Sequence, residues 1–430
     1  MSPDYPPQRQ QGSNMAEQTK PSPRERRAAA RSYRQLRKHL NRLPIAFPRT
    51  ILGAELRILR RLFSPEEAQL ALAMDHLPRT SHEITTRLGA ITSCTIAKNT
   101  RNPDAIELQL RDMAAKGAIL RRAVDSTRGN GSDILSPDDT FALLPFIVGM
   151  FEFQAERLTP EFVKDSTDYM KQGFAFEYLT TAKPQTRIIP VNRALPQTNK
   201  IAAYDEFEQL IRAAEGRIAV ARCICRVTAD MNGKPCSHTE RRELCLALND
   251  FADTAVREGW GRALTVSEAL ECAHQSLGEG LVLQTSNELN PHFICACCGD
   301  CCGLLAMLKA VPNPIEHTAT NYQVELIANT CIACGLCVKK CPMDALHLRT
   351  TGGGTSTLVI TQERCIGCGV CTVVCPVAAV QLVPRETEVV PPSNGEELHR
   401  EIAQTRPNMT RKVRLVRQVL FKKLFRRRLG

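Results

Sequence analysis

The 430-residue sequence lacks an apolar run long enough to cross a bilayer, which takes about 20 residues. Its longest apolar stretch, Phe141–Phe153, is interrupted by Pro145. Residues 1–30 are hydrophilic and contain no apolar signal core, so secretion is not expected and a cytoplasmic location is predicted. Glycine-rich loops of the dinucleotide-binding and P-loop types are also missing, so no motif indicates a nucleotide-dependent enzyme.

Cysteine, by contrast, is abundant, with 19 in the chain. A leaderless chain of this length does not suggest a secreted disulfide scaffold, so the cysteines indicate metal binding. Hydrophobic residues make up 43% of the sequence and charged residues 23%, which argues against a wholly disordered chain. The length predicts roughly two to four domains with sizeable cores.

Basic residues exceed acidic ones by 11, but the excess lies at the two ends. Residues 24–42 carry a net charge of +7 and residues 402–430 a net charge of +10, so the body between them is −6. Positive charge therefore favours nucleic-acid binding at the ends alone. We predict a basic, largely disordered segment over 1–43, with a helix across Arg24–Leu43.

A basic C-terminal tail is predicted over 389–430. Its apolar residues spread around a helical wheel instead of forming one face. Two alternatives therefore remain for the tail: it docks peripherally on an anionic membrane or a partner, or it is merely solvated.

Residues 44–155 show a pattern of three helices followed by a hairpin. Capping boxes begin helices at Ser64 and Thr80, and a third helix is predicted over 103–116. The predicted strands are Ala118–Val124 and Thr140–Leu144. This order resembles a winged-helix domain, a fold that often binds DNA. However, 103–116 has a net charge of −1, whereas a helix that crosses phosphates needs positive charge, so protein contact is favoured over DNA binding.

A mixed connecting region is predicted over 156–215, and the strongest motif of the chain lies beyond it, within 316–388. The run CxxCxxCxxxCP occurs twice, 34 residues apart. Two-residue gaps let three thiolates of one tight loop reach three corners of an iron–sulfur cube, while the fourth cysteine points away from that cube. Zinc fits this run poorly because zinc sites use paired CxxC units. The eight cysteines are Cys331, Cys334, Cys337, Cys341, Cys365, Cys368, Cys371 and Cys375.

The duplicated run resembles the bacterial two-cluster ferredoxin, with every ligand position filled. The resemblance implies a duplicated βαβ domain that binds two [4Fe-4S] clusters and exchanges single electrons with a redox partner protein. It also implies that each cluster takes its fourth ligand from the other half. One set would be Cys331, Cys334, Cys337 and Cys375, and the other Cys365, Cys368, Cys371 and Cys341.

A second concentration of cysteines lies within 216–315. One group follows the strand-like Ile218–Ala221 and another follows the strand-like His292–Ile294. Thiols at two strand ends predict one or two additional metal or redox sites. For the first group an Fe–S cluster is favoured over zinc and over unligated or redox-active thiols. For the second, a cluster or redox-active thiols stand level with zinc or structural thiols. The nine residues are Cys223, Cys225, Cys236, Cys245, Cys295, Cys297, Cys298, Cys301 and Cys302.

Four residues in or near the cysteine-rich region have individual predictions. Cys245 is placed on a helix, and Arg226 is either a counter-ion for thiolates or a surface side chain. Cys272, within a predicted helix Ser267–Ser276, is expected to be a buried small hydrophobe, and Cys94, upstream of the region, is given no role.

The segments Cys223–Arg226 and Cys297–Cys302, ahead of the ferredoxin repeat, resemble multidomain 4Fe–4S binding proteins of anaerobic microbes. That resemblance implies redox work but no particular substrate. Cys297-Cys298-Gly299 also resembles a motif of disulfide-reductase subunits.

The predicted fold class is α+β, with a winged-helix-like domain, a Cys-rich α/β region and a ferredoxin-type domain. We predict an electron-transfer partner or subunit of a larger oxidoreductase. The alternative is a redox-sensing, DNA-binding regulator.

Overall fold

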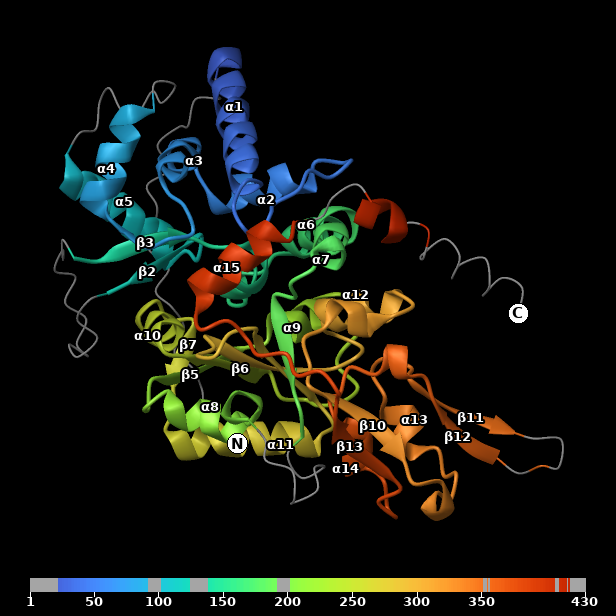
Figure 1. The fold of residues 1–430 in the computed structure, drawn as a ribbon. Coiled ribbons are helices and arrows are strands. Elements are labelled where there is room, and N and C mark those ends of the chain that lie inside the picture. The colour runs from blue at the N-terminus through green and yellow to red at the C-terminus, as the bar shows by residue number, and fades with distance from the viewer. Residues whose placement is uncertain are drawn as a thin grey trace.

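A computed structural model describes residues 22–91, 102–123, 138–191, 202–350, 354, 356–406, 410–415 and 417. Helices and sheets are mixed along the chain, as the α+β class requires. Figure 1 shows a helical N-terminal part, a central sheet and a C-terminal part from which the β11–β12 hairpin projects. Within the described residues, every helix is too short or too polar to traverse a bilayer.

The N-terminal part combines helices with a small sheet of order β1-β3-β2. Both predicted capping boxes form: the Ser64 and Thr80 hydroxyls accept hydrogen bonds from the Glu67 and Glu83 amides. The winged-helix assignment stays a prediction, and Cys94 lies outside the described residues. The elements are α1 (Pro23–Leu40), α2 (Ala54–Leu62), α3 (Pro65–Leu70), β1 (Arg79–Thr80), α4 (Ser81–Ala90), α5 (Pro103–Ala115), β2 (Ile119–Arg122) and β3 (Thr140–Leu143).

Helix α1 corrects the prediction of a largely disordered segment over 1–43 for residues 23–40, and residues 1–21 lie outside the described residues. Tyr33, Leu36 and Leu40 are spaced three and four residues apart, so they share one face of the helix and are buried against α2 and α3. The predicted helix across Arg24–Leu43 is confirmed, and its basic residues lie on the remaining faces.

A six-stranded sheet of order β4-β8-β9-β6-β5-β7 forms the centre of the molecule. Its pairings are all antiparallel, so the prediction of an α/β region is wrong in this respect. Strand β4 belongs to this sheet although it lies in the predicted connecting region. The elements are α6 (Pro160–Tyr169), α7 (Ala175–Thr180), β4 (Thr186–Ile189), α8 (Phe207–Ala213), β5 (Ile218–Arg222), α9 (Ile224–Met231), β6 (Glu243–Leu248), α10 (Asp250–Arg257), β7 (Gly261–Ala263), α11 (Val266–Gly278), β8 (Val282–Ser286), β9 (Phe293–Cys297) and α12 (Gly303–Ala310).

Strand alternation divides the side chains of this sheet between two faces. Val220, Leu246 and Ile294 share a core with residues of α8 and α11. The residues next to them, Cys245 and Cys295, therefore point to the opposite face. The prediction that Cys245 lies on a helix is wrong, because its apolar neighbours alternate with a period of two.

The C-terminal part contains two antiparallel strand pairs, β10 with β13 and β11 with β12. Each half of the cysteine repeat contributes one short helix between two strands. The elements are β10 (Tyr322–Leu326), α13 (Leu336–Lys340), β11 (Leu346–Thr350), β12 (Ser356–Ile360), α14 (Val370–Val373), β13 (Val380–Pro384) and α15 (Gly395–Gln404).

Helix α15 crosses back over the N-terminal part (Figure 1) and buries Leu398 and Ile402. The Arg406 guanidinium donates to the backbone carbonyl of Asn41 at 2.9 Å. The predicted tail over 389–430 therefore begins with a docked helix, and residues beyond 417 lie outside the described residues.

A buried ion pair ties the central sheet to the C-terminal part. Arg187 on β4 pairs with Asp205, each 1% exposed, and Asn321 donates to Asp205 at 2.8 Å. Replacing Asp205→Ala leaves a buried guanidinium without its anion, so we expect about 3–5 kcal/mol loss in the free energy of unfolding. Chemical denaturation measures it. As a control, Asp168→Ala removes a surface pair with Lys164 and is expected to cost no more than about 1 kcal/mol.

Candidate metal centres

The first ferredoxin loop surrounds a small cavity of about 10 Å³ with four thiols from both halves of the repeat. Ile332, Leu348 and Val377 form its apolar rim. Cys334 is exposed, whereas Cys337 is buried. The structure thus places the distant fourth cysteine beside the loop from which it is separated in sequence. The four thiols that line the cavity are those of Cys331, Cys334, Cys337 and Cys375.

The second loop is deeper in the molecule, with Cys365, Cys368 and Cys371 all buried. Burial raises the pKa of Cys368 to about 12, and the nearby charges of Cys341 and Cys365 act in the same direction. Burial and the thiols of Cys368, Cys365 and Cys341 likewise raise the pKa of Cys371. Cys341 of the first half therefore lies with the loop of the second.

Backbone groups of both halves are aimed at sulfur. The Ala345 amide donates to Cys341 Sγ at 3.3 Å, and the Ala379 amide donates to Cys375 Sγ at 3.2 Å. Gly335 and Gly369 adopt positive φ at the start of α13 and α14, which lets each loop wind tightly. Crossed thiols with N–H donors suit two [4Fe-4S] clusters, which supply one-electron redox chemistry when bound.

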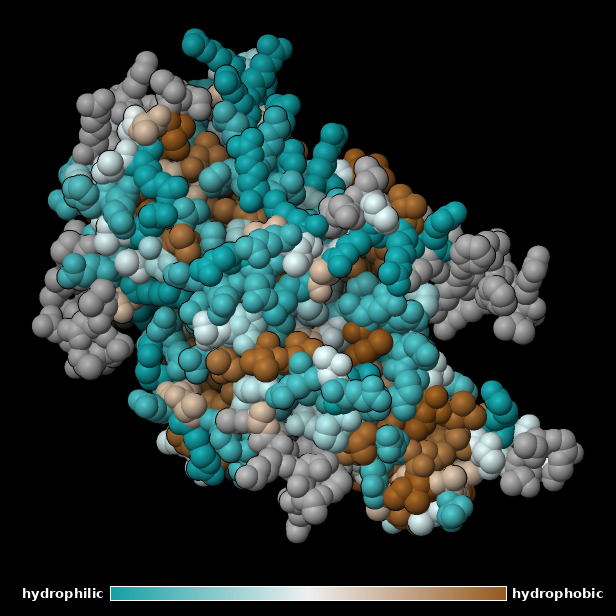
Figure 2. Space-filling model, viewed as in Figure 1, coloured by the Kyte–Doolittle hydropathy of each residue, from teal (hydrophilic) through white to brown (hydrophobic). Residues whose placement is uncertain are grey.

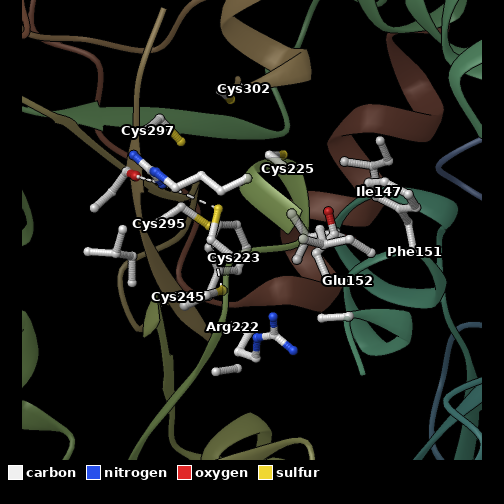
Figure 3. A pocket seen from close by; sticks show the side chains of 18 of the residues that line it. Ile147, Phe151, Glu152, Arg222, Cys223, Cys225, Cys245, Cys295, Cys297 and Cys302 are labelled. Atoms are coloured by element: carbon white, nitrogen blue, oxygen red, sulfur yellow. Dashed lines mark hydrogen bonds between the residues drawn. The ribbon is translucent and has the colours of Figure 1, made fainter. Parts of the chain in front are cut away.

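Six of the upstream cysteines form a second concentration of thiols, which we call the inner group. They line a cavity of about 90 Å³, which Cys298 and Cys301 line as well. Figure 3 shows the six thiols on one side of it and Ile147, Phe151 and Glu152 on the other. Hydrogen bonds to Cys245 and Cys297, together with burial, raise the pKa of Cys295. The thiols influence one another in the order Cys245, Cys295, Cys297, Cys302, Cys225 and Cys223, and Cys245 Sγ lies 3.9 Å from Cys295 Sγ.

Arg226 lies between the inner group and the remaining thiols. It is 1% exposed, and its guanidinium donates to Cys223 Sγ at 3.3 Å and to the Ala296 carbonyl at 2.9 Å. Although burial lowers the pKa of Arg226, the charges of Cys223, Cys298 and Cys236 raise it overall. A buried guanidinium is costly unless anions face it, so Arg226 fits the counter-ion interpretation and not that of a surface side chain.

The remaining three upstream thiols form an outer group: Cys236, Cys298 and Cys301. Their grouping differs from the sequence order, because Cys236 lies with the loop after β9 and not with Cys223 and Cys225. Asp300 joins the outer group, although it is absent from the residues predicted for these sites. Its position between two cysteine pairs was the one signal in the sequence. Cys272 on α11 is half-buried instead of buried, and Arg241 donates to its sulfur at 3.8 Å.

A larger polar cavity of about 740 Å³ lies where the N-terminal part, the central sheet and α15 meet. His76, His292 and His399 come from these three regions, and Glu288 is 2% exposed on the cavity wall. Glu288 Oε2 is buried without a hydrogen-bond partner among the described residues. The histidines are scattered along the sequence, and only the fold brings them together.

The packing of His399 in this cavity predicts that the stability of the protein decreases in acid. Burial, with His76, His292 and Arg122 nearby, lowers the pKa of His399 to about 4. In the unfolded chain this imidazole takes up a proton near pH 6.5, whereas in the folded protein it stays neutral until about pH 4. The free energy of unfolding is therefore unaffected by His399 above pH 6.5 and decreases as pH falls toward 4. We expect His399→Gln to lose less stability than the wild type between pH 7 and 5. Thermal denaturation at both values measures this, with exposed His347→Gln as the control that keeps the wild-type slope.

Comparison with known proteins supports the C-terminal assignment. Residues 330–379 match the family described as a 4Fe-4S dicluster domain, and this range contains all eight ferredoxin cysteines. The chain therefore contains a 4Fe-4S dicluster domain. No curated protein and no solved structure matches the chain.

Proposed function

We propose that this protein conducts single electrons through its two [4Fe-4S] clusters to the upstream cysteines, as a partner or subunit of a larger oxidoreductase. The carrying observation is that only the first loop of this series of cysteine groups has an exposed thiol. Cys334 of that loop is exposed, the three thiols of the second loop are buried, and the thiols of the inner group are buried or half-buried. The first loop is therefore open to a donor or acceptor, and the other groups are more enclosed.

The exposed end has the character of a transient docking surface. Ile332 is 62% exposed, and Leu348 and Val377 beside it are also exposed. Figure 2 shows the hydrophobic patch over this part of the molecule. Exposed apolar patches of this kind mark interaction sites, and electron-transfer complexes use small interfaces. A redox partner protein would dock here, against the first cluster.

The turn between β9 and α12, which Cys297 and Cys302 of the inner group flank, is in contact with the second cluster site. Pro342, next to Cys341, packs against Gly299, where an added Cβ would lie 3.4 Å from Pro342 Cα. Gly299 follows Cys297 and Cys298 directly, so the two cysteine-rich loops touch. The second loop is further fixed to the central part by the Val191 amide, which donates to the Cys368 carbonyl at 3.3 Å. These contacts support a role of the inner group as an additional Fe–S redox centre.

Iron and sulfide analysis of the anaerobically purified full chain, with EPR after reduction, tests the conduit. We expect reversible one-electron reduction and at least about eight Fe per chain, or about twelve if the inner group holds a further cluster. Iron well below eight, or clusters that cannot be reversibly reduced, would overturn the proposal. A content of about eight Fe would exclude an Fe–S cluster at the inner group and leave the two ferredoxin clusters.

The docking surface has its own test. Ile332→Glu should slow reduction of the full chain by reduced flavodoxin at least several-fold, while reduction by dithionite is unchanged. Val256→Glu places the same charge at an exposed site on α10 and should have no effect. Equal rates for both variants with flavodoxin would exclude this surface as its docking site.

The alternative, a DNA-binding regulator, has little support in the charges of α5. Arg111 pairs with Glu107 and Asp139, and Lys116 pairs with Glu67, so these cations are already neutralised. We expect no salt-sensitive binding of duplex DNA by the full chain in a gel shift. Sequence-specific binding that weakens with salt would restore the regulator interpretation.

A further inference from the structure

The outer group differs from the other cysteine sites in how closely its ligand atoms approach one another. The thiols of Cys236, Cys298 and Cys301 and a carboxylate oxygen of Asp300 all lie within 4.8 Å of one another. Cys236 Sγ is 3.6 Å from Cys298 Sγ and 4.0 Å from Asp300 Oδ1. Four donor atoms thus converge on one point from two loops that are about sixty residues apart in sequence.

These distances distinguish a single ion from a cluster. An ion that binds two thiolates at about 2.3 Å in a tetrahedral arrangement sets their sulfurs about 3.8 Å apart. In a cubane each thiolate binds a different iron, so the ligand sulfurs stand farther apart than two ligands of one ion. The separation of 3.6 Å between Cys236 and Cys298, with all four donors within 4.8 Å of one another, matches the single ion. Cys245 and Cys295 of the inner group, 3.9 Å apart, are a close pair without such a set of four among the described residues.

The carboxylate of Asp300 is already oriented for this role. The Ser237 amide and hydroxyl each donate to Asp300 Oδ2 at 2.9 Å. This pair of hydrogen bonds holds one oxygen and leaves Oδ1 on the side of Cys236. Such support of a ligating carboxylate by neighbouring donors is typical of metal sites. Ser237 is the residue after Cys236, so the same loop supplies a ligand and positions another.

Charge also suits a divalent ion. Three thiolates and one carboxylate carry four negative charges, and the buried Arg226 lies close to Cys236 and Cys298. A divalent ion and this guanidinium together offset most of that charge. Thiolates with one carboxylate are ligands that zinc accepts, whereas calcium and magnesium prefer oxygen alone.

We propose that Cys236, Cys298, Cys301 and Asp300 bind one tetrahedral zinc ion, separate from every Fe–S cluster. The ion would clamp the loop after α9 onto the turn between β9 and α12. Cys297 and Cys302 of the inner group flank that turn, so the clamp would fix their positions. The site is independent of electron transfer and does not rest on the proposed function.

Metal analysis of the full chain tests this site. Purified anaerobically, the wild type should hold about one zinc per chain, and Asp300→Asn should bind zinc about 10–100-fold more weakly in competition with a chromogenic chelator. Asp300 is exposed, so this variant leaves the core intact. Cys236→Ser should lose the zinc and keep the iron content of the wild type. Cys272→Ser, which changes a half-buried thiol outside both groups, should keep both metals.

The outcomes separate this proposal from the electron conduit. A wild type without zinc, whose iron falls by about four in Cys236→Ser, would assign these residues to a cluster and overturn the zinc site. Unchanged zinc affinity in Asp300→Asn would remove Asp300 from the ligand set and thereby refute the four-ligand site. If the protein held zinc but lacked the ferredoxin clusters, the zinc site would be supported. The same result would contradict the proposed electron transfer.

Discussion

Replacing Cys375→Ala should abolish the cluster of the first loop although that loop keeps its own three cysteines. Cys375 lines the cavity of Cys331, Cys334 and Cys337, and a [4Fe-4S] cluster needs four ligands. We expect iron to fall by about four per chain and one of the two reduced EPR signals to disappear. The surviving cluster should belong to the buried second loop.

The reciprocal change, Cys341→Ala, provides the matched comparison. Cys341 lies with Cys368 and Cys371, so the same loss of about four Fe should now remove the buried cluster. The two variants should therefore retain different EPR signals. If each variant instead lost the cluster of its own half, ligation would be local and the crossed arrangement wrong.

The ferredoxin part was predictable because its ligands follow a short repeated spacing. The three thiols of each loop lie within seven residues, where the chain itself determines which sulfurs can meet. Even the crossed fourth ligand follows from the motif, since α13 (Leu336–Lys340) carries the chain away from the loop before it reaches Cys341. The structure places Cys341 and Cys375 accordingly.

The upstream cysteines were identified as a set, but their grouping was not predictable. Which thiols meet depends on the sheet, where Cys245 faces Cys295 across β6 and β9 at 3.9 Å. Loop conformation then takes Cys236 away from Cys223 and toward Cys298. Tertiary packing decides both contacts, and sequence spacing carries no information about it.

The roles of Asp300 and Arg226 could not be predicted from the sequence either. An acid in a cysteine-rich turn and an arginine after CxC are both compatible with solvent exposure, which is the usual location of such residues. Arg226 is buried only because α9 packs its side chain against the Ala296 carbonyl of β9. The histidines of the polar cavity depend on three separate regions and were out of reach for the same reason.

Gly367 should be the least replaceable glycine of the ferredoxin part. A Cβ there would lie 2.2 Å from the Tyr322 carbonyl oxygen and 2.6 Å from Thr320 Oγ1, and φ is +68°. The backbone must shift to admit a methyl group, so Gly367→Ala should cost about 2–5 kcal/mol and release the second cluster. Denaturation and iron content measure the two effects.

The repeat itself contains the control for this prediction. Ala333 occupies the equivalent position of the first loop with φ +52°, so positive φ alone does not require glycine there. Ala333→Gly should keep both clusters, and Gly216→Ala, at φ +81° with open space around it, should cost only about 1–2 kcal/mol. If Gly367→Ala lost no more unfolding free energy than Gly216→Ala, the positive φ alone would explain the need for glycine at position 367. A larger loss in Gly367→Ala would show that the close approach of the Tyr322 carbonyl at the start of β10 is what excludes a side chain from the second loop.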